Sequence, residues 1–170
     1  MEKYYNNKEY LSIIDEIIKN DEFKKMSKIK HHNTTRMNHL IKVSFRSYKI
    51  AKYFDLDYKE AAIGGILHDF YSLEIKDCDK FKEKLSLFST GHPNIALNNA
   101  NKNFNLNEKE ENIIVSHMFP ISKKLPKYKE SWIVTTVDKF YSIGEFSKKL
   151  TSKLSYATGL YMLFVLNVLK

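Results

Sequence analysis

A short run of small and apolar residues, positions 61–67, leads directly into the pair His68-Asp69, and this junction constrains the fold more than any other feature of the chain. Two adjacent glycines, Gly64 and Gly65, stand inside the run. Each glycine costs a helix about 1 kcal/mol relative to alanine, so we expect a compensating benefit, namely the close approach of a neighbouring helix. The imidazole and carboxylate that follow offer two metal ligands of complementary hardness at one point.

Apolar residues at helical spacing predict two helices before this junction. The apolar side of the first is formed by Leu11, Ile13, Ile14, Ile17 and Ile18. Thr34-Thr35 supplies an N-cap for a long second helix that ends near Tyr53 and contains His39. Its buried stripe is expected to consist of Met37, Leu40, Ile41, Phe45, Tyr48 and Ile50.

Capping signals predict further helices. Asp57 and Glu60 have the spacing of a capping box, which places a helix start immediately before residue 58, and Asn107 and Glu110 repeat that spacing. A short helix is expected over residues 92–100. Another begins near Trp132, with its core face formed by Ile133, Val137, Phe140 and Tyr141. Since no strand-like alternation separates these segments, the sequence predicts an all-α fold, and its 170 residues suit one domain over residues 1–170 with flanking helices at both ends.

Two segments are harder to interpret. Residues 70–90 have aromatic and charged residues without a clear period, so we expect an irregular excursion with one short helix over about residues 80–87, where a loop that shapes a substrate site would lie. The apolar stretch 160–169 falls well short of the ~20 residues that cross a bilayer. It therefore predicts a packing helix rather than a membrane anchor.

Ligand-type residues recur around the central pair in a fixed order, and each lies in or at the end of a segment predicted to be helical. The set is His39, His68, Asp69, His92, His117 and Asp138. With its surroundings (Arg36-Met-Asn-His39, Gly64-Gly-Ile-Leu-His68-Asp69, Gly91-His92-Pro93, Val115-Ser-His117 and Thr136-Val-Asp138-Lys139), the chain resembles the HD superfamily of metal-dependent phosphohydrolases over roughly residues 30–142. The ordered set is far more specific than an isolated HD dipeptide, which occurs by chance in many proteins.

The resemblance implies an HD-type helical bundle with two metal ions and assigns the ligands. Asp69 would bridge the ions, His39, His68 and Asp138 would complete one, and His92 with His117 would bind the other. Catalysis would centre on Asp69 and His68, with a hydroxide that bridges the metals attacking phosphorus. Mixed imidazole and carboxylate ligation favours iron or manganese, with zinc as an alternative and magnesium less suited to so many nitrogens.

Two basic residues are candidates for substrate binding, each with an open alternative. Arg36 lies one helical turn before His39 and could hold a phosphate, or could pair with a carboxylate on the exposed helix surface. Lys139, beside Asp138, is equally ambiguous. Many two-metal relatives carry a lysine three residues after the HD aspartate, but this chain has Ser72 there. The GYP signature of the cyclic-di-GMP enzymes is also missing.

The expected function is hydrolysis of a phosphate ester or anhydride in a nucleotide or another small phosphorylated molecule. Hydrolases of symmetrical dinucleoside tetraphosphates resemble the chain in ligand order. The alternative is a non-catalytic sensor that binds a nucleotide or a metal on the HD fold. His31 and His32 lie outside the ordered set and are expected in a solvent-facing loop.

Composition bears on partners and compartment. The net charge is +8, but the 28 basic residues include only two arginines and the lysines are spread along the chain, so nucleic acid is not expected as a partner. The single Cys78 cannot form an intramolecular disulfide, and no secretory signal opens the sequence, so we expect a cytoplasmic protein without a membrane partner. A homodimer is left open.

Overall fold

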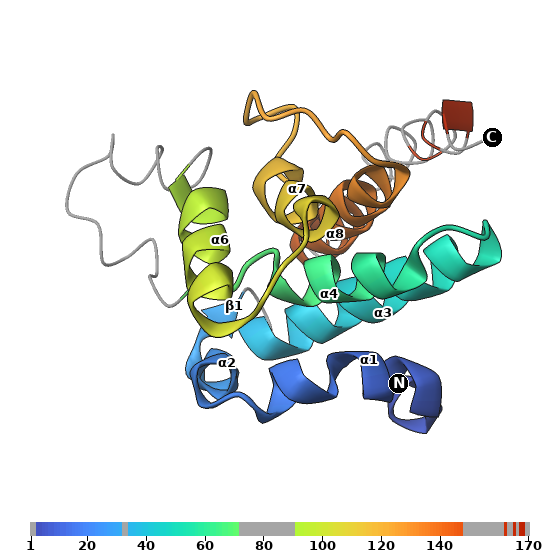
Figure 1. The fold of residues 1–170 in the computed structure, drawn as a ribbon. Helices are drawn as coiled ribbons and strands as arrows, with labels where there is room; N and C mark the ends of the chain where they lie inside the picture. The colour runs from blue at the N-terminus through green and yellow to red at the C-terminus, as the bar shows by residue number, and fades with distance from the viewer. Residues whose placement is uncertain are drawn as a thin grey trace.

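The computed structural model of the chain describes residues 3–31, 34–71 and 91–147, with four further positions at 162, 165, 167 and 168, and this part of the chain is all-α (Figure 1). Its α-helices are α1 (Lys8–Lys19), α2 (Asp21–Lys24), α3 (Arg36–Tyr53), α4 (Tyr58–Leu67), α6 (His92–Asn103), α7 (Glu108–Ser116) and α8 (Lys129–Ser147). Two 3-10 helices, η1 (Lys3–Asn6) and η2 (Lys25–Lys28), and two short strands, β1 (Lys30–His31) and β2 (Thr34–Thr35), complete the described elements. The predicted all-α, single-domain fold is confirmed.

The two strands form a small addition that the sequence pattern did not predict. They pair antiparallel, with Lys30 opposite Thr35 and His31 opposite Thr34, and together they lead into α3. Thr35 is also the N-cap of α3, because its side chain accepts a hydrogen bond from the backbone N–H of Asn38 at 3.3 Å. The predicted cap and the end of the helix at Tyr53 are therefore confirmed.

Helices α3 and α4 lie side by side at the centre of the fold (Figure 1), and Gly65 permits this contact. A Cβ atom added to Gly65 would lie 3.0 Å from the Cα atom of Ser44 on α3. A Cβ atom added to Gly64 would lie 2.6 Å from Cγ2 of Ile113 on α7. The expected benefit of the two glycines is thus confirmed, and it involves two neighbouring helices rather than one.

Helix α1 covers the side of the α3–α4 pair away from α7 and α8 (Figure 1). Ile14 and Ile17 are buried there as predicted, and so is Tyr10, which the apolar pattern missed. The Tyr10 hydroxyl donates to Ser44 Oγ at 2.9 Å, and that hydroxyl donates to the carbonyl of Ala62 at 2.7 Å. This chain of hydrogen bonds joins α1, α3 and α4 within the core.

The two predicted capping boxes have different outcomes. Asn107 and Glu110 form the full box, since Asn107 Oδ1 accepts from the Glu110 N–H and Glu110 Oε2 accepts from the Asn107 N–H. Asp57 does precede α4, but the predicted box with Glu60 is wrong. The Asp57 N–H donates instead to Glu130 Oε1 at 3.0 Å, and Glu60 accepts from the Asn107 side chain at 2.7 Å.

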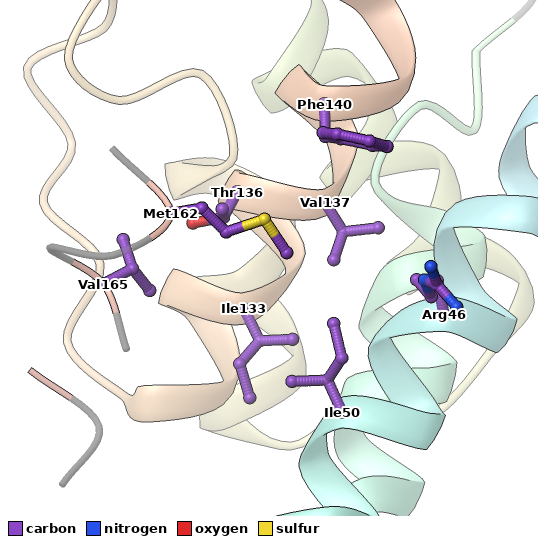
Figure 2. A pocket seen from close by; sticks show the side chains of 8 residues that line it. All are labelled: Arg46, Ile50, Ile133, Thr136, Val137, Phe140, Met162 and Val165. Carbon is purple, nitrogen blue, oxygen red and sulfur yellow. The ribbon is translucent and has the colours of Figure 1, made fainter. Parts of the chain in front are cut away.

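Helix α8 begins at Lys129, three residues before the predicted start, and one of its expected core residues is misplaced. Ile133 and Val137 are buried, but Phe140 is 49% exposed. Phe140 borders an apolar hollow of about 100 Å³ (Figure 2). The other lining residues are Arg46, Ile50, Ile133, Thr136, Val137, Met162 and Val165.

Several expectations lie outside the described residues: the helix over 80–87, the neighbourhood of His32, Ser72 and Cys78, and most of the stretch 160–169. None of the described helices is long and apolar enough to cross a membrane.

Candidate metal centre

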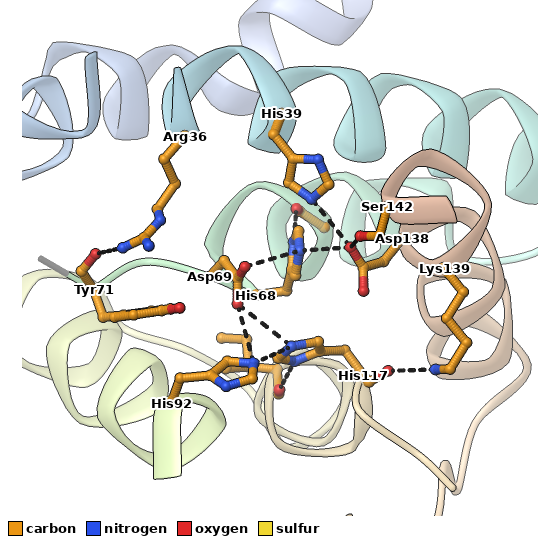
Figure 3. A network of polar contacts seen from close by, with 12 residues as sticks. Arg36, His39, His68, Asp69, Tyr71, His92, His117, Asp138, Lys139 and Ser142 are labelled. Atoms are coloured by element: carbon orange, nitrogen blue, oxygen red, sulfur yellow. Dashed lines mark hydrogen bonds and ion pairs between the residues drawn. The ribbon is translucent and has the colours of Figure 1, made fainter. Parts of the chain in front are cut away.

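Five helices bring the six predicted ligand residues together in one buried cluster (Figure 3). His39 lies in the first turns of α3, His92 opens α6, and Asp138 lies within α8. The pair His68-Asp69 follows α4, and His117 follows α7. All six are buried, with exposed fractions of 0% for His39, 0% for His68, 7% for Asp69, 5% for His92, 1% for His117 and 6% for Asp138. The six residues that the resemblance implies as ligands therefore do lie close together in the fold.

One half of the cluster is organised around Asp138. Its Oδ1 atom lies 3.0 Å from Nε2 of His39 and 3.4 Å from Nε2 of His68. Asp69 reaches the same half through its Oδ2 atom, which lies 4.0 Å from His68 Nε2. His39, His68 and Asp69 each offer one ligand atom within 4.8 Å of the others.

The other half is organised around the second oxygen of Asp69. Asp69 Oδ1 lies 3.4 Å from Nε2 of His92 and 3.4 Å from Nε2 of His117. The two Nε2 atoms are themselves only 3.0 Å apart, a separation that requires a proton or a cation between them. Asp69 therefore belongs to both halves and directs one oxygen toward each.

These separations fit metal coordination. Nitrogen and oxygen ligands stand about 2.0–2.2 Å from an ion such as zinc, so two ligands of one ion are about 3.0 Å apart at a right angle and about 3.4 Å apart at the tetrahedral angle. Within the described residues, His68 Nε2 and Asp69 Oδ1 are buried without a hydrogen-bond partner. Since buried polar atoms without a hydrogen bond are costly, the donor set suits a cation, and the cluster could hold metal.

Two of the histidines are oriented by the ends of their helices. His68 Nδ1–H donates to the carbonyl of Gly65 at 2.8 Å, and His117 Nδ1–H donates to the carbonyl of Ile114 at 2.7 Å. These carbonyls belong to the last turns of α4 and α7, where backbone acceptors have no partner inside the helix. Because each Nδ1 is the donor, each Nε2 faces the cluster, where a metal can bind it in place of a proton.

The charges in the cluster stabilise one another. Burial raises the pKa of Asp69, but the imidazoles of His68, His92 and His117 outweigh it and hold that pKa well below its usual value. The same balance, with His39 and His68 as partners, lowers the pKa of Asp138. Burial lowers the pKa of His68, yet the two carboxylates raise it to about 9. Both carboxylates are therefore ionised at neutral pH, as metal ligands must be.

Arg36 points from α3 toward the same region as His39 (Figure 3). The alternative of an exposed surface pair is wrong, because Arg36 is only 4% exposed. Its Nη1 group donates to the backbone carbonyl of Tyr71, and its guanidinium carbon lies 4.0 Å from the centroid of the Tyr71 ring. Contact with a substrate remains a prediction for Arg36.

Lys139 is directed away from the cluster. Its Nζ atom donates to the backbone carbonyl of His117 at 2.9 Å (Figure 3). Burial lowers the pKa of Lys139 to about 8, against the opposing effect of Asp138. Lys139 thus joins α8 to the end of α7, and its predicted substrate role has no geometric support beyond its position next to Asp138.

Two side chains near the cluster were not found from the sequence. The Ser142 hydroxyl, one helical turn after Asp138, donates to Asp138 Oδ1 at 3.3 Å, and the four-residue spacing could have indicated this contact. Tyr71 lies against His92, with 5.4 Å between ring centroids. Its place depends on a turn after α4 that no motif marks.

Comparisons with protein-family models, curated proteins and solved structures found no match to this chain. The residues and their geometry therefore carry the interpretation. They define an all-α protein with a buried histidine and aspartate cluster that could bind metal, and this arrangement is compatible with an HD-like fold.

Proposed function

We propose that this chain is a metal-dependent phosphohydrolase of the HD type that acts on a nucleotide or another small phosphorylated molecule. The observation that carries the proposal is the position of Asp69, whose Oδ2 faces His68 and whose Oδ1 faces His92 and His117. A carboxylate with one oxygen toward each of two ligand groups is suited to bridge two ions, as the HD resemblance implies.

In this proposal His39, His68 and Asp138 hold one ion together with Asp69, while His92 and His117 hold the other. Two divalent ions held by these residues would activate a water and neutralise charge on a phosphoryl group. Iron or manganese suits the mixture of four imidazoles and two carboxylates, with zinc as an alternative.

The chain's own residues would prepare the cluster for this chemistry. Burial reduces competition from bulk water and strengthens each charge interaction. The carbonyls of Gly65 and Ile114 hold His68 and His117 in one orientation, so neither of these two rings has to reorient when substrate binds. Arg36 and Tyr71 form one wall beside Asp69 and His92 (Figure 3), and they are donors next to a site that would receive an anion.

The test uses protein purified without chelators, with metal content measured by elemental analysis. Hydrolysis of phosphate mono- and diesters, mononucleotides and dinucleoside polyphosphates is then assayed with added manganese or iron. We expect metal-dependent turnover of at least one substrate, loss of turnover in Asp69→Asn, and normal turnover in the control His31→Ala, which changes a histidine outside the cluster. Metal and nucleotide binding without any turnover would instead support the sensor interpretation.

A further inference from the structure

The chain turns sharply after α4 and places Tyr71 beside the histidine and aspartate cluster. Phe70 N–H donates to the carbonyl of Leu67 at 3.1 Å, and Tyr71 N–H donates to the carbonyl of Asp69 at 2.8 Å. Asn99 on α6 fixes the turn, because its side-chain amide donates to the carbonyl of Phe70 at 3.1 Å. In Figure 3 the hydroxyl end of Tyr71 is directed toward the space between Asp69 and His92.

The Tyr71 hydroxyl differs from those of the other well-buried tyrosines. Tyr10 and Tyr48 are 0% and 2% exposed, and their hydroxyls donate to Ser44 and Glu9. Tyr71 is 7% exposed, yet within the described residues its hydroxyl has no hydrogen bond, and it is not among the buried polar atoms that lack a partner. The hydroxyl therefore keeps access to the space beside the cluster, where it can donate to a molecule that enters.

Arg36 fixes the position of this tyrosine. It contacts both the backbone carbonyl and the ring face of Tyr71, and the ring also lies against His92 at a centroid distance of 5.4 Å. A ring with two such neighbours and a bonded carbonyl has little freedom to turn. A hydroxyl held in place donates with less loss of entropy when a ligand arrives.

We propose that the Tyr71 hydroxyl donates a hydrogen bond to a phosphoryl oxygen of the substrate, and that Arg36 is the positioning residue that holds Tyr71 for this contact. The inference rests on the proposed function. Tyr71 would supply a donor two residues after Asp69, in a chain that has Ser72 where many two-metal HD proteins carry a lysine. A phenol is protonated at neutral pH and can serve as this donor without any change of charge.

Tyr71→Phe tests the proposal, because it removes the hydroxyl and keeps the ring that contacts Arg36 and His92. The readouts are the dissociation constant of inorganic phosphate for the manganese-loaded protein, measured by calorimetry, and kcat and KM for the best substrate. Loss of one hydrogen bond should weaken phosphate binding about two- to tenfold and reduce kcat/KM at least as much, with unchanged metal content. Tyr53→Phe is the matched control, since Tyr53 is 84% exposed.

A double-mutant cycle separates the role of Arg36 from direct phosphate binding. If Arg36 acts through Tyr71, then Arg36→Ala weakens phosphate binding in the wild-type background and has little further effect in Tyr71→Phe. Arg36→Lys should restore part of the affinity by keeping the charge over the ring. Additive effects of the two substitutions would show that Arg36 contacts phosphate itself and would overturn its positioning role.

The outcomes also distinguish this inference from the proposed function. Unchanged phosphate affinity and turnover in Tyr71→Phe would overturn the role of Tyr71 even in an active hydrolase. A wild-type protein that binds no phosphate would overturn it as well. A protein that binds phosphate through Tyr71 but hydrolyses none of the substrates would contradict the hydrolase proposal and leave the contact established.

Discussion

Asp69 is the residue on which both halves of the cluster depend, because its two oxygens face different histidines. His117 belongs to the half around Asp69 Oδ1, which lies 3.4 Å from its Nε2, and its ring contacts the ring of His68. This asymmetry gives the two residues different consequences on mutation. The comparison of the two variants therefore tests whether Asp69 is shared by both halves of the cluster.

We therefore predict that Asp69→Ala removes metal from both halves, whereas His117→Ala keeps metal bound by His39, His68 and Asp138. Elemental analysis of the two purified variants measures the difference. A size-exclusion elution volume and a circular dichroism spectrum like those of the wild type would show that both variants are folded. Equal metal content in the two variants would mean that Asp69 does not bridge.

Glu110 provides a pH-dependent test away from the metal ligands. Burial raises the pKa of Glu110 to about 7, opposed by its hydrogen bond to the Asn107 backbone and assisted by Glu60. Because the folded-state pKa is raised, folding stability is full below the unfolded value of about 4.5 and falls as the pH rises through about 7. Ionised Glu110 is therefore a source of instability at pH 8.

Replacing Glu110 with glutamine keeps an acceptor for the capping box and removes the ionisation. The unfolding free energy of Glu110→Gln relative to wild type should increase between pH 5 and pH 8, by on the order of 1–3 kcal/mol. Urea denaturation at the two pH values measures it. Glu108→Gln, an exposed position in the same turn, is the control and should show no such change. A difference in unfolding free energy that does not change with pH would refute the raised pKa of Glu110.

At the scale of elements, the sequence predicted most helices but not all of their partners. The caps at Thr35 and Asn107 were correctly predicted because every group in them lies within three residues. The box at Asp57 failed because Glu130, 73 positions away, takes the same N–H. Phe140 was wrongly predicted to be buried, because helical spacing shows which face of α8 a residue lies on but not which element covers that face. Local rules thus predicted the elements, and long-range contacts decided the exceptions.

The same division applies to the candidate site. The order of His39, His68-Asp69, His92, His117 and Asp138 was sufficient to predict which residues gather. The sequence could not show that Lys139 would turn to the carbonyl of His117, or that Tyr71 would return to the cluster. Both depend on backbone groups whose positions follow from the packing of α4, α7 and α8.

The glycine pair offers a test of that packing. Gly64→Ala should be destabilising because its methyl group meets the side chain of Ile113, and Ile113→Ala should recover part of the loss. Gly65→Ala meets the Cα atom of Ser44, so trimming Ser44 to alanine should give no recovery. We expect each glycine substitution to cost about 1–3 kcal/mol in urea denaturation. If Ser44→Ala also recovered stability in Gly65→Ala, the Ser44 backbone would not be what limits the approach of α3 to α4.

At the scale of the whole molecule, the fold serves to bring five helix segments to one point. Helices α3 and α4 carry His39 and His68-Asp69 across their close contact, while α6, α7 and α8 supply the remaining ligands. Hydrophobic packing on both sides of α3 fixes these segments. The ligands are therefore assembled by burial of apolar surface, and a bound cation would offset the cost of placing them in the core.

The most direct measurement is the anomalous scattering of a crystal of protein purified without chelators, collected at the absorption edge of the metal that elemental analysis identifies. We predict two peaks, one between Asp69 and the group formed by His39, His68 and Asp138, and one between Asp69, His92 and His117, each about 2.0–2.2 Å from its ligand atoms. A single peak that Asp69 does not contact, or no peak in the cluster, would contradict the bridging role of Asp69.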